Sequence, residues 1–411
     1  MYNTNTNIFT KYYYFDANGT TPLYSGALEA YENNAYLGNS SAIYADEAKA
    51  IIKNAENILK GWCNAPDAKI IFNSGASEGN NHIFYSFAHK DIMSHFIISA
   101  LEHNTSIKCA EQLRDDGKIE LTFIYPNIYG LIDPIDVLNN IKSNTNLISI
   151  MSANNETGSI MPFMEISEIA KQHNIVFHSD AVQYIGKYPI DMRYGPDIIT
   201  GSFHKFHGPQ GLGFIICNCP SKLTPMIYGS QFYGLRGGTE NIPAIAGATE
   251  AMKYVFNNRL NKNQRMVDMK QYILQKLKIY DKLPFEQFVG KSDDYVIYGN
   301  GTPICIVPLS NKSVANTLTI SFIKRNVGLD KKFCNIVLRD ALFKDKCIVS
   351  IGSACHTASK SPSHVLTALR LPFIIRAGVI RISMHDMTSW SHIKHFVKKL
   401  IKRINEQKYK N

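Results

Sequence analysis

The sequence lacks the long hydrophobic segments that membrane insertion or export would need. No run among its 411 residues approaches the roughly 20 apolar residues of a spanning helix, and residues 1–14 contain no apolar core of a signal peptide. Mitochondrial presequences are rich in arginine, whereas residues 1–16 contain no arginine and have Lys11 as their only basic residue. We therefore expect a cytoplasmic protein that makes no contact with a membrane.

Cysteine is sparse and irregularly spaced, which argues against a disulfide framework. With 45% hydrophobic residues the chain can bury a core that needs no such cross-links, and its 8 cysteines are scattered. Cys217 and Cys219 form a single C-x-C pair, which is weak evidence for a metal, so we expect ordinary thiols and no metal site. Cys355 differs because small residues surround it, as in a loop, where a thiolate stabilised by neighbouring His356 would be reactive.

Acidic residues are too few to balance the basic ones, since 34 Asp and Glu face 44 Lys and Arg for a formal net charge of +10. Such a balance is typical of nucleic-acid binding. Much of the excess lies in residues 394–410, however, where apolar residues recur at helical spacing, namely Ile393, Val397, Leu400, Ile401 and Ile404. We interpret this segment as an amphipathic helix with a solvated basic face, or alternatively a docking surface for a partner, and do not expect nucleic-acid binding.

The chain also has no internal repeat and no low-complexity linker, so its organisation is deduced from periodicity. Residues 26–60 are predicted to be largely helical, and a regular alternation of strands and helices follows over residues 69–213. Such alternation predicts a sheet of mainly parallel strands covered by helices. Residues 244–254 and 265–280 are predicted as two helices that lead out of this unit.

Two later strands, over residues 302–308 and 317–322, indicate a smaller α+β unit. We therefore predict an α/β protein with a large three-layer αβα domain over residues 16–252, built on a mainly parallel mixed sheet. A small α+β domain is predicted over residues 253–411, and we expect residues 1–15 to pack against it.

Polar residues stand at the ends of the predicted strands. Asp180 follows a strand that begins at Ile175, and Lys205 follows the next strand, over residues 197–200. Open α/β sheets place their ligands at these strand ends. A carboxylate and a lysine suit pyridoxal phosphate, because this cofactor needs a Schiff-base lysine and an acid that keeps its ring nitrogen protonated. The two residues alone leave open a partly buried ion pair.

Three more strand ends contribute polar groups. The turn at residues 73–78 opens a helix, so free backbone N–H groups and the positive end of the helix dipole form an anion cup. His103 follows another strand and could lie flat on an aromatic cofactor, although a single histidine is more often structural. Residues 154–158 end a further strand, and Ser202 and His204 flank the lysine with donors suited to a phosphate.

The chain resembles the cysteine desulfurases, which are class V, fold-type I pyridoxal phosphate enzymes. Each matching motif is weak alone, but they occur in the family's order over nearly the whole chain. The motifs are residues 16–22, 38–41, 74–78, 102–103, 154–158, 178–183, 202–205, 236–239, 352–355 and 381–383.

This resemblance implies a role for each cofactor-binding residue. Lys205 would carry pyridoxal phosphate and move the substrate Cα proton, Asp180 would pair with the ring nitrogen, and His103 would stack on the ring. Gln183 would hydrogen-bond the ring hydroxyl, and Asn155 is also expected among the cofactor-binding residues. The residues expected to hold the phosphate are Ala76, Ser77, Ser202 and His204, joined by Thr239 from a neighbouring subunit in a homodimer.

The resemblance also implies the substrate and its fate. Arg381 would bind the carboxylate of L-cysteine through its two-pronged guanidinium, helped by Asn155. Cys355 would take the sulfur as a persulfide and release L-alanine. The sulfur would then serve iron–sulfur cluster assembly or thiolation, so the expected partners are the substrate, a second copy of the chain and a sulfur-acceptor or iron–sulfur scaffold protein.

Some positions depart from the family pattern. Phe232-Tyr233 replaces a usual Glu-Arg, Tyr44 replaces a common histidine, and Met384-His385 replaces Leu-Gly. An extended segment over residues 351–365 indicates the long-loop group, whereas the polar segment 284–313 has no assigned role. A selenocysteine lyase, a class V aminotransferase and a catalytically silent binding partner remain alternatives.

Overall fold

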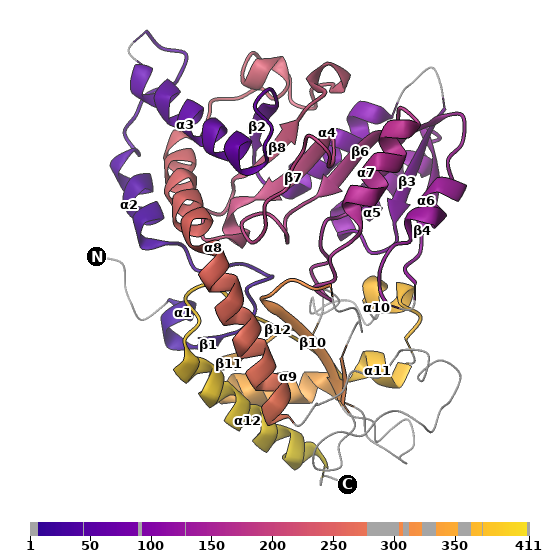
Figure 1. Ribbon diagram of the computed structural model, residues 1–411. Helices are drawn as coiled ribbons and strands as arrows, with labels where there is room; N and C mark the ends of the chain where they lie inside the picture. The colour runs from indigo at the N-terminus through magenta and orange to yellow at the C-terminus, as the bar shows by residue number, and fades with distance from the viewer. Residues whose placement is uncertain are drawn as a thin grey trace.

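The computed structural model contains two layered units, one above the other in Figure 1. Helix α8 (Ile242–Lys276) runs from the upper unit into the lower one. The structure describes residues 7–43, 45–88, 93–127, 129–277, 304–306, 312–322, 334–351, 363–371 and 373–408.

The upper unit is built on a seven-stranded sheet of order β2-β8-β7-β6-β5-β3-β4. Strand β8 is antiparallel to both of its neighbours, and the other neighbouring strands pair in parallel. This arrangement confirms the predicted mainly parallel mixed sheet. The strands are β2 (Lys69–Asn73), β3 (Ser94–Ser99), β4 (Ile119–Ile124), β5 (Thr145–Ser149), β6 (Val176–Asp180), β7 (Ile198–Ser202) and β8 (Gly213–Cys217).

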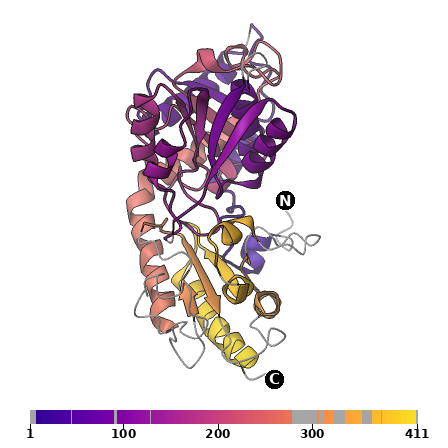
Figure 2. The same ribbon diagram turned by 90° about the vertical axis from the view of Figure 1, so that its right-hand side faces the viewer.

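Helices cover this sheet so completely that several of its strands are buried along their whole length. Every residue of β3, β6, β7 and β8 is buried, as expected where helices lie on both faces, whereas the edge strand β4 is half-exposed along its middle. Figure 2 shows the sheet between its helical layers. The connecting helices are α4 (Ala76–Phe87), α5 (Asn104–Asp115), α6 (Pro134–Asn139) and α7 (Phe163–Gln172).

The helices outside the strand–helix alternation differ from the prediction. The helical stretch expected over residues 26–60 is divided into α2 (Ser25–Asn33) and α3 (Asp46–Trp62). The two helices expected over residues 244–280 are one continuous helix, α8. The expected break falls on mostly polar, largely exposed residues of α8, where the sequence has no apolar periodicity to indicate a helix. One apolar residue in this stretch, Phe256, stacks on Trp62 with ring centroids 3.6 Å apart.

The lower unit is a three-stranded antiparallel sheet of order β12-β10-β9. A second, two-stranded sheet pairs β1 with β11 in parallel. The strands are β1 (Tyr13–Tyr14), β9 (Ile304–Ile306), β10 (Thr317–Phe322), β11 (Cys347–Ile348) and β12 (Val379–Ser383). The helices are α1 (Ile8–Lys11), α9 (Asn335–Lys344), α10 (His364–Ala368), α11 (Phe373–Ala377) and α12 (Trp390–Lys408).

Each unit has its own hydrophobic core, and the N-terminal segment belongs to the lower one. Phe15 is fully buried there and lies 4.4 Å from Phe396, centroid to centroid. The two halves of α8 contribute to different cores, Met252 to the upper and Met269 to the lower. The predicted boundary between residues 252 and 253 therefore falls inside a continuous helix and stays a prediction.

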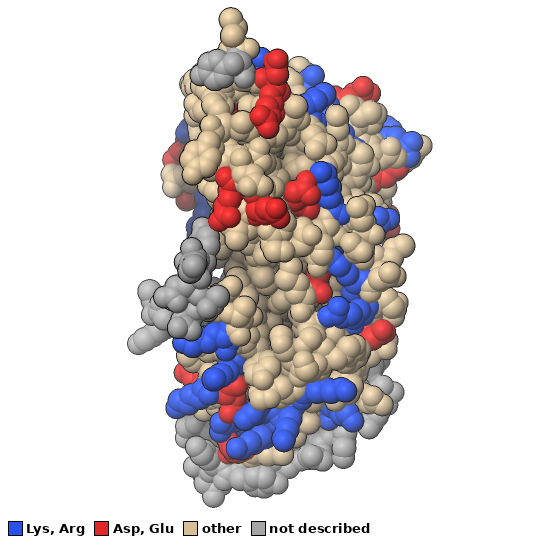
Figure 3. Space-filling view, turned by 90° about the vertical axis from the view of Figure 1, so that its left-hand side faces the viewer, with Lys and Arg blue, Asp and Glu red and all other residues tan. Residues whose placement is uncertain are grey.

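The basic C-terminal segment forms α12, with the predicted apolar face. Ile393, Val397, Leu400 and Ile404 are buried, and the exposed lysines lie on the other side, at the lower end of the molecule in Figure 3. None of the helices in the described part of the chain is long and apolar enough to cross a bilayer.

Candidate active site

A cavity of about 440 Å³ lies where the strands of the large sheet end at their carboxyl side. This is the position that open α/β sheets use for ligands. Nine of the site residues that were predicted from the sequence line this cavity, namely Ala76, Ser77, His103, Asn155, Asp180, Gln183, Ser202, His204 and Lys205. The structure thus brings together most of the predicted site.

One wall of the cavity is the N-terminus of α4. Its N-cap is Gly75, which has no side chain to cap the first amides, so the N–H groups of the first turn remain available to an anion. Gly75 has a φ of +151°, which favours glycine. A Cβ on Gly213 would lie 2.5 Å from the Cα of Gly75, so there is no room for a side chain on Gly213. Glycine is therefore required on both sides of this close approach.

His204 faces the same wall as a neutral imidazole. Burial, aided by the positive charge of Lys205, lowers the pKa of His204 to about 4. Nδ1 of His204 lies 3.0 Å from Oγ1 of Thr20. His204 and Ser202, the last residue of β7, add polar side chains to the backbone N–H groups of α4. Together these groups fit a phosphate.

Asp180 is held at the end of β6 by two hydrogen bonds. The residue is buried, with an exposure of 4%. Oδ1 accepts from the backbone N–H of Val182 at 3.0 Å, and Oδ2 accepts from Nδ2 of Asn80 at 2.8 Å. Asn80 in turn accepts from the hydroxyl of Thr200 at 2.5 Å. Neither Asn80 nor Thr200 was predicted as a site residue from the sequence, although Asn80 lies one turn into α4, whose start was predicted.

The hydrogen-bonded chain continues into the sheet through His178. Nε2 of His178 lies 3.3 Å from Oγ1 of Thr200, and Nδ1 lies 2.8 Å from Oγ of Ser149. Burial lowers the pKa of His178 to about 3, so this imidazole is neutral. The carboxylate of Asp180 is thus the cavity end of a buried polar network that orients it.

Lys205 lies in a short 3₁₀ turn directly after β7. Its Nζ donates to the backbone carbonyls of Asn18 and Gly19, at 2.7 Å each. Burial first, and the positive charge of Arg381 second, lower the pKa of Lys205 to about 8, while Asp16 and Asp180 oppose the shift. A lysine of this kind is neutral in part near physiological pH, as a nucleophilic amine must be.

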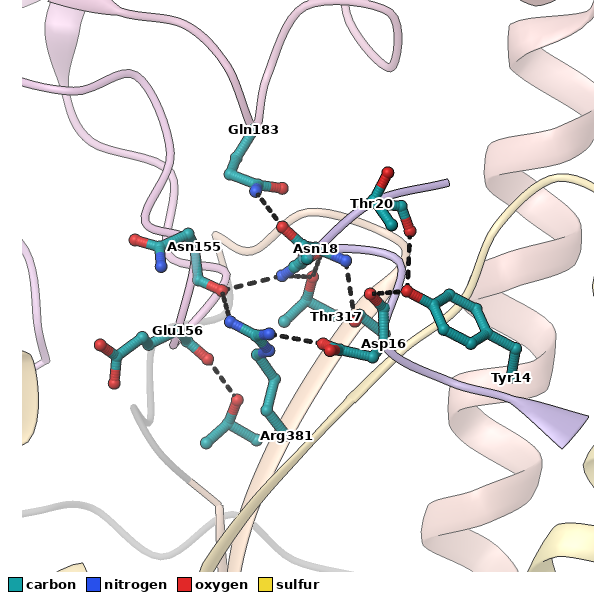
Figure 4. Close-up of polar contacts among 12 residues, drawn as sticks. Tyr14, Asp16, Asn18, Thr20, Asn155, Glu156, Gln183, Thr317 and Arg381 are labelled. Carbon is teal, nitrogen blue, oxygen red and sulfur yellow. Dashed lines mark hydrogen bonds and ion pairs between the residues drawn. The ribbon is translucent and has the colours of Figure 1, made fainter. Parts of the chain in front are cut away.

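The N-terminal turn at residues 16–20 lies at the centre of the polar contacts in Figure 4. The carbonyl oxygen of Asn18 also accepts from Nε2 of Gln183 at 3.1 Å, and Nδ2 of Asn18 donates to the carbonyl of Asn155 at 2.9 Å. The sequence marked this turn only as a matching motif. Its role as a hydrogen-bonding hub depends on contacts that the sequence does not reveal.

His103 is the N-cap of α5 and also lines the cavity. Its Nδ1 accepts from the backbone N–H of Thr105 at 3.3 Å, which leaves the proton of the neutral ring on Nε2. Burial lowers the pKa of His103, and the negative charge of Asp180 opposes the shift. A neutral aromatic ring at this wall suits stacking on a flat cofactor.

Arg381, on β12, is buried with a residue exposure of 5%. Its Nη1 donates to the carbonyl of Asn155 at 2.8 Å, and its Nη2 lies 2.6 Å from Oδ1 of Asp16. Arg381 is not among the described residues that line the cavity. The predicted role of this side chain in binding a substrate carboxylate stays a prediction, because the guanidinium is engaged by Asp16.

Thr239 is exposed in a loop and is likewise not among the described residues that line the cavity. Arg236 ties this loop to α4 through an ion pair with Glu78, with 2.9 Å between Nε and Oε1. Cys355 and the core of the predicted long loop lie outside the described residues, as does Tyr44.

Two departures from the family pattern have structural roles in this chain. Phe232 is buried 5.8 Å from Phe72, centroid to centroid, and Tyr233 donates its hydroxyl to Glu56 at 2.8 Å. Met384 is fully buried in the core of the lower unit. Phe232 and Tyr233 thus anchor the loop, by packing and by a hydrogen bond, and Met384 stabilises the lower unit by packing.

Comparison with known proteins agrees with this geometry. Residues 13–294 match the family model described as aminotransferase class-V. A cysteine desulfurase IscS of Dictyoglomus turgidum is 32% identical over 379 residues, which cover 90% of this chain and 89% of the relative. A cysteine desulfurase IscS of Methanosarcina thermophila is 32% identical over 397 residues, or 94% and 90% of the two chains.

Solved structures give the same result. One called NifS-like protein superposes with a TM-score of 0.81 at 26% identity, over 96% of this chain and 99% of the other. Another, SspA in complex with cysteine, superposes with a TM-score of 0.74 at 27% identity, over 92% and 99%. The chain therefore belongs to the class V aminotransferase family and, within it, to the cysteine desulfurases.

Proposed function

We propose that the protein is a pyridoxal phosphate-dependent cysteine desulfurase that converts L-cysteine to L-alanine and takes up the sulfur as a persulfide. The observation that carries the proposal is that Lys205 and Asp180 face one cavity, next to the uncapped N-terminus of α4. The relatives named cysteine desulfurase support the choice of substrate.

The residues around the cavity fit the cofactor group by group. The amides at Ala76 and Ser77, with the side chains of Ser202 and His204, would hold its phosphate. Asp180 would face the ring nitrogen and Gln183 the ring hydroxyl, with His103 stacked on the ring. Pyridoxal phosphate, when bound, supplies an electron sink that stabilises negative charge at the substrate Cα.

Lys205 would act through its neutral amine. Its Nζ would bind the cofactor covalently and, once released by the substrate amine, would take the proton from the substrate Cα. The carbonyls of Asn18 and Gly19, each 2.7 Å from Nζ, would hold the released amine near the cavity.

Cys355 would supply the nucleophile for the sulfur. Its thiolate would attack the substrate sulfur, so that an S–S bond forms as the Cβ–S bond breaks. The electron pair of the broken bond would stay with the substrate carbon, which is protonated and leaves as L-alanine. Asn155 and Arg381 would bind the substrate carboxylate during these steps.

Assembly and sulfur transfer complete the proposal. Thr239, exposed and apart from the cavity of its own chain, would reach the phosphate of a second copy, so the active form would be a homodimer in the cytoplasm. A monomer by light scattering that still turns over cysteine would contradict this. The persulfide would pass to an acceptor, such as an iron–sulfur scaffold protein.

The decisive experiment compares Cys355→Ser with Cys334→Ser, a control at a thiol that is partly accessible in the described part of the chain. Both variants should be yellow and bind cysteine, because Lys205 and Arg381 are unchanged. Only Cys355→Ser should release no sulfide under reductant, and mass spectrometry of the unaltered protein should find one added sulfur on the Cys355 peptide. Sulfide release by Cys355→Ser at the unaltered rate, or added sulfur on the Cys334 or Cys347 peptide, would refute the mechanism assigned to Cys355. A colourless protein that cannot be reconstituted would favour a silent binding partner.

A further inference from the structure

The ion pair between Asp16 and Arg381 joins residues 365 positions apart in the chain. The side chain of Arg381 is 7% exposed and that of Asp16 is 27% exposed, so the carboxylate lies on the more open side of the pair. Figure 4 shows the guanidinium between Asp16 and the carbonyl of Asn155. The remaining nitrogen, Nε, is buried and has no hydrogen-bond partner among the described residues.

The backbone of Asp16 is fixed to the strand that carries Arg381. Asp16 forms a parallel bridge with Ser383, two residues beyond Arg381 on β12. The backbone N–H of Asn18 donates to Oγ of Ser383 at 3.0 Å, and the hydroxyl of Tyr14 donates to the carbonyl of Asp16 at 2.9 Å. Only the side chain of Asp16 can therefore leave the guanidinium without disturbing this sheet.

Each nitrogen of the Arg381 guanidinium is either buried or already paired among the described residues. Nε is buried, Nη1 donates to Asn155, Nη2 is paired with Asp16, and Arg381 is not among the described residues that line the cavity. A two-pronged contact with a carboxylate needs two donors at once. Two carboxylates packed against one buried guanidinium also repel each other, so one must give way.

We propose that Asp16 is a specificity-determining residue that occupies Arg381 as an internal carboxylate and is displaced by the carboxylate of the substrate. The exchange keeps the buried arginine neutralised at every stage, which avoids the cost of an unpaired buried charge. The substrate carboxylate then adds less to affinity than it would at an unoccupied arginine. This inference rests on the proposed function, because it assigns Arg381 to the substrate carboxylate.

The test measures binding of L-alanine, the expected product, to the cofactor-loaded protein by its visible absorbance. L-alaninamide, which lacks the carboxylate, is titrated in parallel. Asp16→Asn removes the competing charge, so it should tighten L-alanine binding at least about tenfold, or about 1.4 kcal/mol. Binding of L-alaninamide should change less than about twofold on the same scale.

Two further variants separate competition from a structural role. Asp345→Asn makes the same charge change in an ion pair with Arg403, and neither residue is among the described residues that line the cavity, so both affinities should be unchanged. Asp16→Glu keeps the charge and should bind L-alanine as the unaltered protein does. Unchanged or weaker L-alanine binding in Asp16→Asn would overturn the proposal.

Folding is checked by thermal unfolding, with Asp16→Ser as a second charge-removing variant. If both charge-removing variants unfold while Asp16→Glu does not, Asp16 has a structural role and the proposal is wrong. Sulfide release by the unaltered protein is measured alongside. Its absence would refute the desulfurase function while leaving the comparison of L-alanine with L-alaninamide valid for Arg381.

Discussion

Replacing Asn80 with alanine should disconnect Asp180 from the polar network beneath the cavity. Asn80 is fully buried, donates to Asp180 at 2.8 Å and accepts from Thr200 at 2.5 Å. Alanine can make neither hydrogen bond, so the carboxylate of Asp180 loses a donor and the hydroxyl of Thr200 loses its acceptor. Both groups are buried, so leaving either one without its hydrogen-bond partner costs free energy.

The size of the effect follows from these two bonds. A hydrogen bond to a charged group contributes about 1.5–3 kcal/mol and a neutral one about 0.5–1.5 kcal/mol. Their joint loss should destabilise the large unit by about 3 kcal/mol, and at roughly 2–4 °C per kcal/mol the midpoint of thermal unfolding should fall by roughly 6–12 °C. The affinity for pyridoxal phosphate should fall too, since Asp180 is then oriented by its bond from Val182 alone.

Asn81→Ala is the matched control, because Asn81 is the next residue of α4 and makes one exposed hydrogen bond, to the carbonyl of Ser77 at 2.7 Å. Its loss should lower the midpoint by a few degrees at most and leave cofactor affinity unchanged. Thermal unfolding of both apo variants, followed by absorbance titration with the cofactor, provides the comparison. Equal midpoints and equal affinities in the two variants would refute the role given to Asn80.

Two further predictions concern pH. Burial and Arg381 lower the pKa of Lys205 to about 8, below its usual value, so the neutral amine predominates above that pH. The rate of cofactor uptake by the apo protein, measured by stopped flow, should therefore rise from pH 7 to pH 9. A rise centred near pH 10.5 would contradict this. Because burial lowers the pKa of His178 to about 3, the unfolded chain binds a proton that the folded one does not between about pH 6.5 and pH 3. The stability that depends on this residue is fully present above pH 6.5 and is lost as the pH falls, at up to about 1.4 kcal/mol per pH unit. In His178→Gln, the free energy of unfolding measured with denaturant should therefore fall less steeply with decreasing pH than in the unaltered protein. An unchanged pH dependence would refute the assignment.

The fold was predictable because its signals are local. The alternation of apolar strands with amphipathic helices marked the parallel sheet, and β10 begins and ends at the predicted residues, Thr317 and Phe322. Asp180 and Lys205 could be placed in one cavity because they follow neighbouring parallel strands, whose carboxyl ends meet. The single helix α8 was not predicted, because polar residues in its middle interrupt the apolar pattern.

The hydrogen bonds that position the site could not be predicted from local signals. Asn80 and Asp180 are 100 positions apart, and Asn18 and Gln183 are 165 apart. Each of these residues has an ordinary local role, in a helix or a turn, and gains its function only from what the fold places opposite it. The motif match indicated that residues 16–22 matter, but it gave no atom for them to contact.

The N-terminal turn links the two units beside the cavity. The carbonyl of Asn18 accepts from Lys205 and Gln183 of the upper unit, while its side chain donates to Thr317 of the lower unit at 2.9 Å. A shift of the small unit would therefore move the carbonyl that holds Nζ of Lys205, and with it the ion pair of Asp16 and Arg381. Because the same five-residue turn contacts the lysine and the arginine, displacement of Asp16 by a substrate carboxylate would change the charge near the amine of Lys205, and with it the pKa of that amine.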